Sequence, residues 1–467
     1  MFYKITPGLN ASLTINTDFS ATEVDDRQVN LTRFGLFFPE KRDFFLKDSD
    51  IFEFGRLTAT DDMPFSEPTL QNGRPFFSRS IGLSAFGEPV DLAYGGKLSG
   101  RVGRWNLGTL AIRQEEYAGV DEQDLFVGRA ALNVLGESAL GMIVTSGDPR
   151  SNAGNSVVGA DFRYLNTRLP GGRQVHAEAW YQRSDTDGLD DDDAAFGFRA
   201  RMPNNTGWRG GLGMKQLEAN FNPALGFVNR LGVRDHTLEV GYTLRPNRPR
   251  LVNVFAGLDA QRIELLDGGA LQSQTIRARL VELESRNGDS LRLRYQADKE
   301  VLFEPFEISP GVVIPTGSYS FNRYRAALET SAFRRLSGEI AIENGEFFAG
   351  TRQDVEVGFN WKPSRHFQAR IAYVTNEVDL PEGAFTARLG RIGLDVVFSN
   401  TLSWVNLIQY DNFTETIGFN SRLHWIPQAG REAFIVLNHN LQDLDRNDSF
   451  HSAAADLSMK LSYTFRF

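Results

Sequence analysis

The chain has 467 residues, a formal net charge of −9 at pH 7 and no cysteine. The lack of cysteine excludes disulfide scaffolds and zinc–thiolate sites, and the acidic charge argues against nucleic acid as a partner. Hydrophobic residues make up 41% of the chain. They nowhere form the run of about 18 apolar residues that a helical membrane span requires.

Residues 1–19 form the first predicted unit. From Leu9 to Phe19, apolar and polar side chains alternate. Because successive side chains of a strand point to opposite faces, this pattern predicts a β-strand with one apolar and one polar face.

Residues 20–91 form the second unit, in which the alternation is lost. Structureless connections of more than about 12 to 15 residues are uncommon in compact folds and are usually functional. Phenylalanines at high density need burial, and the arginines among them need carboxylates or water. The candidate functional residues here are Arg33, Phe37, Phe38, Glu40, Lys41, Arg42, Phe44, Phe45 and Arg79. The charges at positions 40–42 lie between phenylalanine pairs, so they are expected to be partly buried and must then be paired. They either form structural pairs with the barrel wall or have a ligand-facing or gating role.

Residues 92–467 form the third unit, where alternation recurs between short turns and longer, acidic or Gly-rich connections. Strands are predicted near 92–101, 103–115, 124–135, 137–147, 154–166, 173–185, 193–203, 206–218, 234–245, 248–264, 270–284, 288–302, 317–331, 335–347, 350–363, 366–378, 383–399, 401–412, 415–427, 432–441 and 456–467. With the strand at Leu9–Phe19 the total is about 22, an even number as in bacterial single-chain barrels.

The last predicted strand is long, strictly alternating and ends on Phe467. Membrane barrels carry such aromatic residues at the interfaces. We therefore predict an all-β fold, a transmembrane antiparallel β-barrel of about 22 strands in the outer membrane of a Gram-negative bacterium, in contact with lipid and lipopolysaccharide. No secretory signal is visible at Met1, so we expect a mature or truncated form.

The lumen of such a barrel provides the burial that residues 20–91 need. Barrels of about 22 strands are typically plugged, so we predict that this unit is an N-terminal lumenal plug-like or constriction segment. The alternation also predicts lumen-facing side chains at Arg277, Arg279, Arg292, Arg294, Glu356, Arg370, Asp395 and Arg422. A wall of mixed charge can select the ions that pass, or it can be a socket, that is, a surface whose charges pair with the charges of the segment.

No metal site, cofactor or catalytic residue is predicted. The six histidines are scattered singly, without the spacing of metal ligands. The acidic run that contains Asp185, Asp187 and Asp190 has two interpretations, a calcium site and a solvated outer loop, and its spacing favours the loop. Asp235-His236 is the best candidate for a hydrolase dyad, but the sequence offers no nucleophile beside it.

Several stretches of the N-terminal part resemble one known family. They are Thr6-Pro7-Gly8-Leu9-Asn10, Asn16-Thr17-Asp18-Phe19-Ser20, Glu23-Val24-Asp25, Asn30-Leu31-Thr32-Arg33-Phe34, Phe37-Phe38-Pro39-Glu40-Lys41-Arg42-Asp43-Phe44-Phe45-Leu46 and Phe76-Phe77-Ser78-Arg79-Ser80-Ile81-Gly82. In these stretches the chain resembles the DUF5916 family of bacterial outer-membrane proteins. The resemblance implies a C-terminal barrel of unknown function, normally preceded by a family 9-like carbohydrate-binding sandwich that is absent here. The chain departs from the family pattern at Asp43, Lys47-Asp48 and Ser80.

The expected function is that of a non-enzymatic channel or transporter for a polar solute. The resemblance implies that a glycan-derived solute, and hence a carbohydrate ligand, is one candidate. The alternative is a structural or assembly component that docks periplasmic or surface protein subunits, and a third is an outer-membrane barrel hydrolase. Fold analogy alone does not separate these functions.

Overall fold

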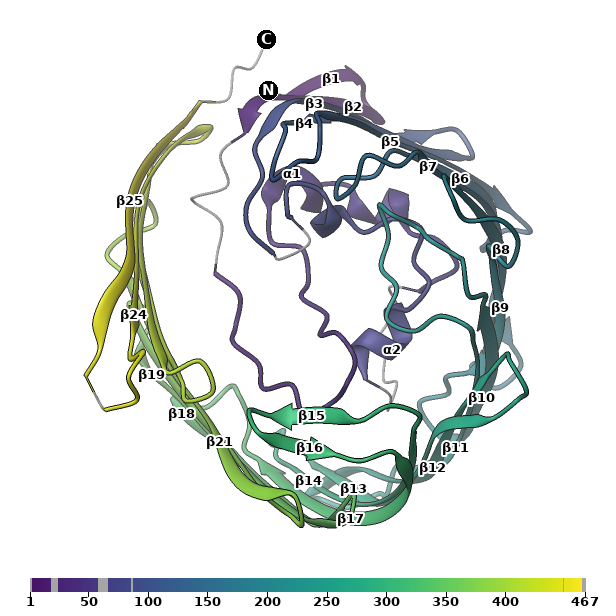
Figure 1. The fold of residues 1–467 in the computed structure, drawn as a ribbon, viewed down its shortest axis with the longest axis vertical. Helices are drawn as coiled ribbons and strands as arrows, with labels where there is room; N and C mark the ends of the chain where they lie inside the picture. Colours follow the sequence, from purple (N-terminus) through teal and green to yellow (C-terminus); the bar gives the residue numbers. More distant parts are fainter. Residues whose placement is uncertain (1, 18–23, 58–65, 85–86, 448, 464–467) are drawn as a thin grey trace.

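The computed structural model describes residues 2–17, 24–57, 66–84, 87–447 and 449–463, and in these the chain is nearly all β (Figure 1). One antiparallel sheet of 23 strands curves into a ring. Its strands are β1 Phe2–Thr6, β2 Leu9–Thr17, β3 Leu92–Val102, β4 Trp105–Gln114, β5 Gln123–Val134, β6 Ser138–Ser146, β7 Asn155–Leu169, β8 Arg173–Thr186, β9 Ala194–Met202, β10 Gly207–Leu217, β11 Val233–Leu244, β12 Leu251–Leu265, β13 Leu271–Ser285, β14 Ser290–Leu302, β17 Gly317–Glu329, β18 Leu336–Phe347, β19 Gly350–Ser364, β20 Phe367–Leu380, β21 Gly383–Val397, β22 Leu402–Asp411, β23 Thr416–Gln428, β24 Arg431–Gln442 and β25 His451–Tyr463. The predicted all-β antiparallel barrel is confirmed.

Each strand pairs with the strand that follows it in the sheet. The β11–β12 ladder, for example, runs without a shift from Val233↔Leu265 to Leu244↔Val254. Among the described residues no pairing joins β25 to β1. The predicted strand end at Phe19 and the terminal Phe467 lie outside the described residues.

The described strands outnumber the expected 22 by one. The difference is β1, whose residues pair with the start of β2 around the Pro7-Gly8 turn. Five residues are too few to show a clear alternation in the sequence.

The two faces of the sheet differ as the alternation predicts. In β11, Leu238, Tyr242 and Leu244 are exposed by 44–51% on the outside of the ring, whereas Asp235 and Glu239 are buried on the inside. The outer surface is therefore apolar and the inner surface polar, which is the arrangement of a barrel set in lipid. Within the described residues, no helix has both the length and the apolar character needed to cross a membrane.

The two edges of the ring carry different connections. One edge, here the short-turn rim, has the turns at 7–8, 103–104, 135–137, 170–172, 203–206, 245–250, 286–289, 330–335, 365–366, 398–401 and 429–430. The opposite edge, the long-loop rim, has the connections at 18–91, 115–122, 147–154, 187–193, 218–232, 266–270, 303–316, 348–349, 381–382, 412–415 and 443–450. Connection length does not separate the two edges strictly, because 348–349 and 381–382 are short connections on the long-loop rim.

Two connections of the long-loop rim contain structure of their own. Residues 18–91 carry the helices α1 Asp43–Leu46, η1 Ser49–Phe52, α2 Glu67–Gln71 and η2 Ser78–Ser80. Residues 303–316 carry a hairpin of β15 Phe306–Ser309 and β16 Val312–Ile314. Figure 1 shows both within the ring of strands. The sequence did not predict this hairpin, because the residues between the predicted strands at 288–302 and 317–331 show only the composition of one of the longer connections.

Candidate functional site

The described residues between 24 and 84 are called the lumenal segment below. The chain leaves β2 at Thr17 and re-enters the wall at Leu92 of β3, and these two residues are register partners at the long-loop rim. Both ends of the connection 18–91, which contains the segment, are therefore held in the wall at the same rim. It is an inward-folded loop, not a free N-terminal domain.

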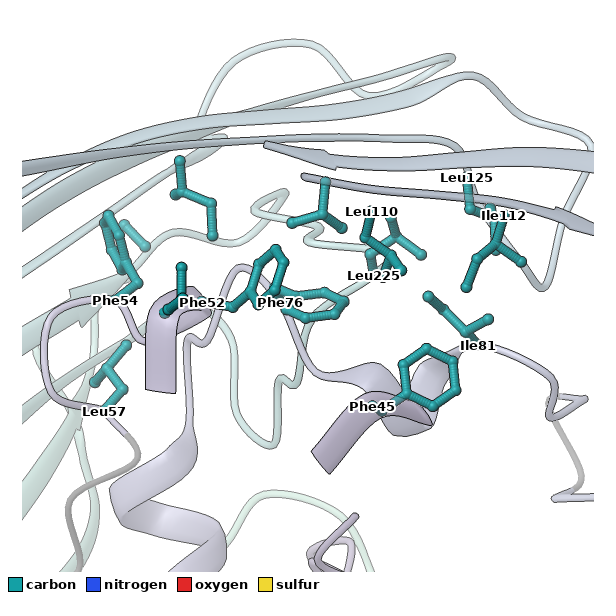
Figure 2. Packing of buried hydrophobic residues seen from close by; sticks show 14 of the residues in the cluster. Phe45, Phe52, Phe54, Leu57, Phe76, Ile81, Leu110, Ile112, Leu125 and Leu225 are labelled. Atoms are coloured by element: carbon teal, nitrogen blue, oxygen red, sulfur yellow. The ribbon is translucent and has the colours of Figure 1, made fainter. Parts of the chain in front are cut away.

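An apolar core attaches the lumenal segment to the inner wall (Figure 2). On the segment side it contains Phe45, Ile51, Phe52, Phe54, Leu57, Phe76 and Ile81, and on the wall side Leu92, Leu110, Ile112, Leu125, Val127, Ile143, Trp180, Ala195 and Leu217. All of these are less than 9% exposed. Burying each such large apolar side chain stabilises the packing by about 1.5–3 kcal/mol. The core explains why so many phenylalanines occur in a connection.

Two wall glycines make room for this core. A Cβ at Gly108 of β4 would lie 2.8 Å from Cζ of Phe52, and one at Gly159 of β7 would lie 2.9 Å from Cζ of Phe54. Real Cβ atoms do not come so close to another carbon, so a larger residue at either position would displace the ring. The wall is thus shaped to receive the segment.

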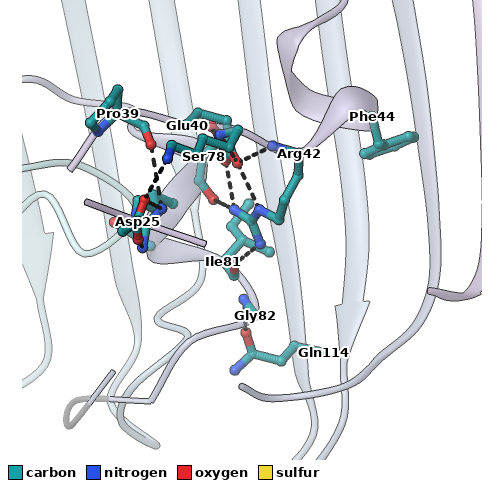
Figure 3. A network of polar contacts seen from close by, with 12 residues as sticks. Asp25, Pro39, Glu40, Arg42, Phe44, Ser78, Ile81, Gly82 and Gln114 are labelled. Carbon is teal, nitrogen blue, oxygen red and sulfur yellow. Dashed lines mark hydrogen bonds and ion pairs between the residues drawn. The ribbon is translucent and has the colours of Figure 1, made fainter. Parts of the chain in front are cut away.

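Arg42 and Glu40 join two distant parts of the segment (Figure 3). Arg42 donates to both carboxylate oxygens of Glu40, at 2.8 Å and 2.6 Å, and to the carbonyl oxygens of Ile81 and Ser78, each at 2.7 Å. The Ser78 hydroxyl also donates to Glu40 at 2.7 Å. Burial alone would raise the pKa of Glu40, but the hydrogen bonds and charge of Arg42 outweigh it and hold this pKa below its ordinary value. Next to this pair, Asp25 accepts from Arg79 and lies 3.7 Å from Nζ of Lys41.

A second connection packs on the lumenal segment. Phe77 donates its backbone N–H to Leu225 at 2.7 Å, and Phe227 donates to Arg74 at 3.0 Å. The Phe227 ring also meets Phe37 edge-on, with centroids 5.1 Å apart, while Phe37 stacks on Phe77 at 4.9 Å. The alternation in the sequence does not predict this inward course of residues 218–232, although Phe221, Leu225 and Phe227 are an apolar signal unusual in an exposed loop.

The other predicted aromatic residues of the segment also have contacts. Phe44 and Phe45 meet edge-on at 5.1 Å, and the guanidinium of Arg42 lies 4.3 Å from the Phe45 ring. Lys97 of β3 donates to the backbone carbonyl of Phe44. Phe38 lies 5.7 Å below the guanidinium of Arg79.

The segment also reaches the far side of the ring. Asp26 pairs with Arg391 of β21 at 2.6 Å, the Arg27 N–H donates to Gln409 of β22 at 2.9 Å, and Arg33 pairs with Glu300 of β14 at 3.3 Å. Leu31 joins an apolar cluster with Ile308, Val312 and Ile314 of the inward hairpin. The segment therefore spans the interior from β4 to β22.

The predicted lumen-facing residues are paired mainly within the wall. Arg279 pairs with Asp259 at 2.9 Å, Arg294 with Glu343 at 2.6 Å and Arg292 with Glu329 at 2.8 Å. Glu356 accepts from Arg325 at 2.8 Å and Asp395 from Arg370 at 2.9 Å, while Arg277 donates to the neutral Gln296 at 3.0 Å. These contacts run to other wall strands, whereas Asp26 and Arg33 of the segment pair with Arg391 and Glu300 of the wall.

Two inner cavities of similar size reach the short-turn rim, and the first of them includes residues of the segment in its lining. One, of about 710 Å³, lies between the segment and β18–β23 and includes Arg370, Arg391, Asp395 and Arg422 in its lining. The other, of about 720 Å³, lies along β10–β14 and β17 and includes Arg277, Arg279, Arg292 and Arg294. The interior is thus not completely filled.

The residues of the calcium and hydrolase candidates are not arranged as such sites. Among the described residues no group of three or more His, Asp or Glu side chains is placed to hold a metal ion. Asp187 accepts the Gly154 N–H at 2.7 Å, as a loop-stabilising residue does. Asp235 is buried on the inner face and bonded to Gln261, whereas His236 points to the outer face, because neighbours on a strand alternate. They do not form a hydrolase dyad.

The fold and its inner core define a β-barrel whose lumen is partly occupied by an inward-folded segment. No family model and no curated protein matches the chain, so the DUF5916 resemblance stays a prediction. Among solved structures, the chain is similar to the FrpB iron transporter from Neisseria meningitidis, with a TM-score of 0.51 and 9% identity over 81% of this chain and 80% of that one. It also aligns with the siderophore receptor PirA from Pseudomonas aeruginosa, with a TM-score of 0.47 and 11% identity over 82% of this chain and 85% of that one. At such identity, the likeness to FrpB shows the fold alone.

Proposed function

We propose that this protein is a non-enzymatic conduit for polar solutes in the outer membrane of a Gram-negative bacterium, with residues 20–91 as a fixed constriction. The apolar outer face and polar inner face support a place in lipid, next to lipopolysaccharide. The shared fold with FrpB, which is an iron transporter, favours transport over catalysis but does not specify the solute. The DUF5916 resemblance favours a glycan-derived solute.

One observation carries the proposal. The connection 18–91 starts and ends in the wall at the long-loop rim, and the lumenal segment within it packs through an apolar core against the wall, yet two cavities remain on the inner face, one of them beside the segment. A connection held in this way cannot leave the barrel through the short-turn rim without unfolding its wall contacts. Solutes must then pass beside the segment, which narrows the lumen and selects what passes.

Conductance in planar bilayers tests this function. We expect the intact protein to conduct poorly and a deletion of Leu31–Gly82 to conduct severalfold more, because a barrel of about 22 strands is wide when unfilled. Shortening 218–232 in addition should raise conductance further, since that connection also packs inside. A variant with the outer loop 443–450 shortened is the matched control and should conduct like the parent.

The outcomes separate the alternatives. If the deletion variant shows the heat-dependent gel shift of a folded barrel but conducts no more than the parent, the conduit is excluded. Docking of periplasmic or surface protein partners would then become the better explanation of the interior segment.

A further inference from the structure

We propose that the cavity along β10–β14 and β17, called the arginine cavity below, binds a soluble polyanion such as a polyphosphorylated or polysulfated solute. The inference names the substrate class of the proposed conduit and rests on that function, although binding itself can be measured without transport. Mainly positive charge faces this space from rigid strands, whereas the other large cavity is balanced in charge.

The lining of the arginine cavity is strongly cationic. It contains seven arginines and only two acidic residues, Glu282 and Glu284. Four of the arginines, at positions 277, 279, 292 and 294, come from the adjacent strands β13 and β14. The other three, Arg209, Arg245 and Arg325, lie on β10, at the end of β11 and on β17. The cations thus surround the space from several strands.

The carboxylates that balance some of these arginines are set back from the cavity. Asp259 and Glu343, which pair with Arg279 and Arg294, are 0% and 5% exposed and do not line it. Such buried carboxylates fix the guanidinium groups in place, because each arginine has further N–H donors beyond those its partner uses. Arg279 and Arg294 are therefore held in place with N–H donors left for a ligand.

Two lining arginines donate hydrogen bonds to neutral side chains. Arg277 donates to Gln296 at 3.0 Å, and Arg245 donates to Asn253 at 3.0 Å. Arg209 and Arg279 also lie over the Phe255 ring, at 5.0 Å and 4.3 Å from its centroid, and this contact orients their guanidinium planes. Planar guanidinium groups bind phosphate, sulfate and carboxylate through pairs of parallel hydrogen bonds.

The second cavity gives an internal comparison. Its volume is nearly the same, about 710 Å³ against about 720 Å³, but its lining holds four cationic and four acidic side chains. The cationic ones are Lys41, Arg370, Arg391 and Arg422, and the acidic ones are Asp26, Glu329, Glu339 and Asp395. The excess of positive charge is thus a property of one cavity and not of the whole lumen. Rings of arginine also give pores their preference for anions.

Isothermal titration of the folded protein in neutral detergent, with sodium tripolyphosphate as the probe, tests the inference. We expect saturable binding at low ionic strength that weakens as salt is added, since exposed charges are screened. The double variant Arg245→Gln/Arg277→Gln should bind at least about tenfold more weakly, because charged hydrogen bonds are lost. Neither change strips a carboxylate of its hydrogen-bonded arginine. The matched control is Arg370→Gln/Arg422→Gln in the balanced cavity, which should leave binding unchanged.

Three results would overturn the inference: no binding by the parent, equal loss in both double variants, or binding that is indifferent to salt. A heat-dependent gel shift of every variant keeps these results separate from misfolding. Binding to a barrel that conducts nothing would refute the conduit and leave the anion site standing. Conductance without tripolyphosphate binding would refute the anion site and leave the conduit standing.

Discussion

Arg42 shows how a single buried charge can organise a connection that contains little regular structure. It is 7% exposed, and its guanidinium joins residues 40–42 to residues 78–81 through a carboxylate and two backbone carbonyls. Removing one partner of a buried ion pair leaves the other charge uncompensated, which is costly. The sequence predicted that Glu40, Lys41 and Arg42 would need partners, and it could not show that Ser78 and Ile81 provide them, because these contacts depend on the path of the intervening chain.

We expect Arg42→Met to lower the local free energy of unfolding of the lumenal segment by about 3 to 5 kcal/mol. Hydrogen–deuterium exchange of residues 39–57 and 76–82 measures this change. Arg101→Met is the control, because Arg101 and its partner Asp50 are more than 60% exposed and such pairs contribute at most about 1 kcal/mol. Equal effects of the two substitutions would show that the Arg42 network does not hold the segment.

The same network should respond to acid. The pKa of Glu40 in the folded protein is held below its ordinary value by Arg42, against the effect of burial. The ionised carboxylate therefore contributes stability at neutral pH, and this contribution is lost as the pH falls below the ordinary carboxyl range and through the lower pKa of the folded state. Exchange at residues 78–82 should accelerate over that window in the parent and not in Glu40→Gln. The variant Asp25→Asn, which removes a neighbouring carboxylate, should still show this acceleration at low pH. If the acceleration were absent in Asp25→Asn, Asp25 and not Glu40 would be its cause.

At the scale of elements, the wall strands have glycines where the phenylalanine rings of the segment pack against them. Alternation in the sequence predicted strand positions and faces well, because one face of each strand must meet lipid and the other the interior. The inward course of residues 218–232 and of the β15–β16 hairpin was not predictable in this way. Their positions depend on contacts with Phe37, Phe77 and Leu31, which lie far away in the sequence.

Gly159→Leu should loosen the segment without unfolding the barrel. The new side chain would occupy the space of the Phe54 ring, since even a Cβ there lies 2.9 Å from Cζ of Phe54. Overpacking of this kind typically costs about 1 to 3 kcal/mol. In bilayers we expect intermittent openings of larger conductance. The control is Gly96→Leu in β3, where a Cβ meets nothing within 4 Å, and openings of equal frequency in both variants would argue against a wall shaped for the segment.

At the scale of the whole molecule, the sequence predicted a barrel with an interior segment, and the structure adds how that segment is attached. A plug that moves out of a barrel needs one free end or a weak wall contact. This segment has neither, since β2 and β3 hold both its ends at one rim and a continuous apolar core fixes its middle. The central claim is therefore that the segment stays in place while solutes pass beside it.

A reversible crosslink measures this most directly, and the absence of native cysteine gives a clean background. In the variant Asp50→Cys/Arg101→Cys, a cleavable bifunctional thiol reagent would tie the segment to β3, at an ion pair that lines neither of the two large cavities. Each single-cysteine variant treated in the same way is the control. If the segment is a fixed constriction, single-channel conductance will be the same before crosslinking, after it and after cleavage of the reagent. Conductance that disappears on crosslinking and returns on cleavage would contradict the account, because it would show that the segment must move for solutes to pass.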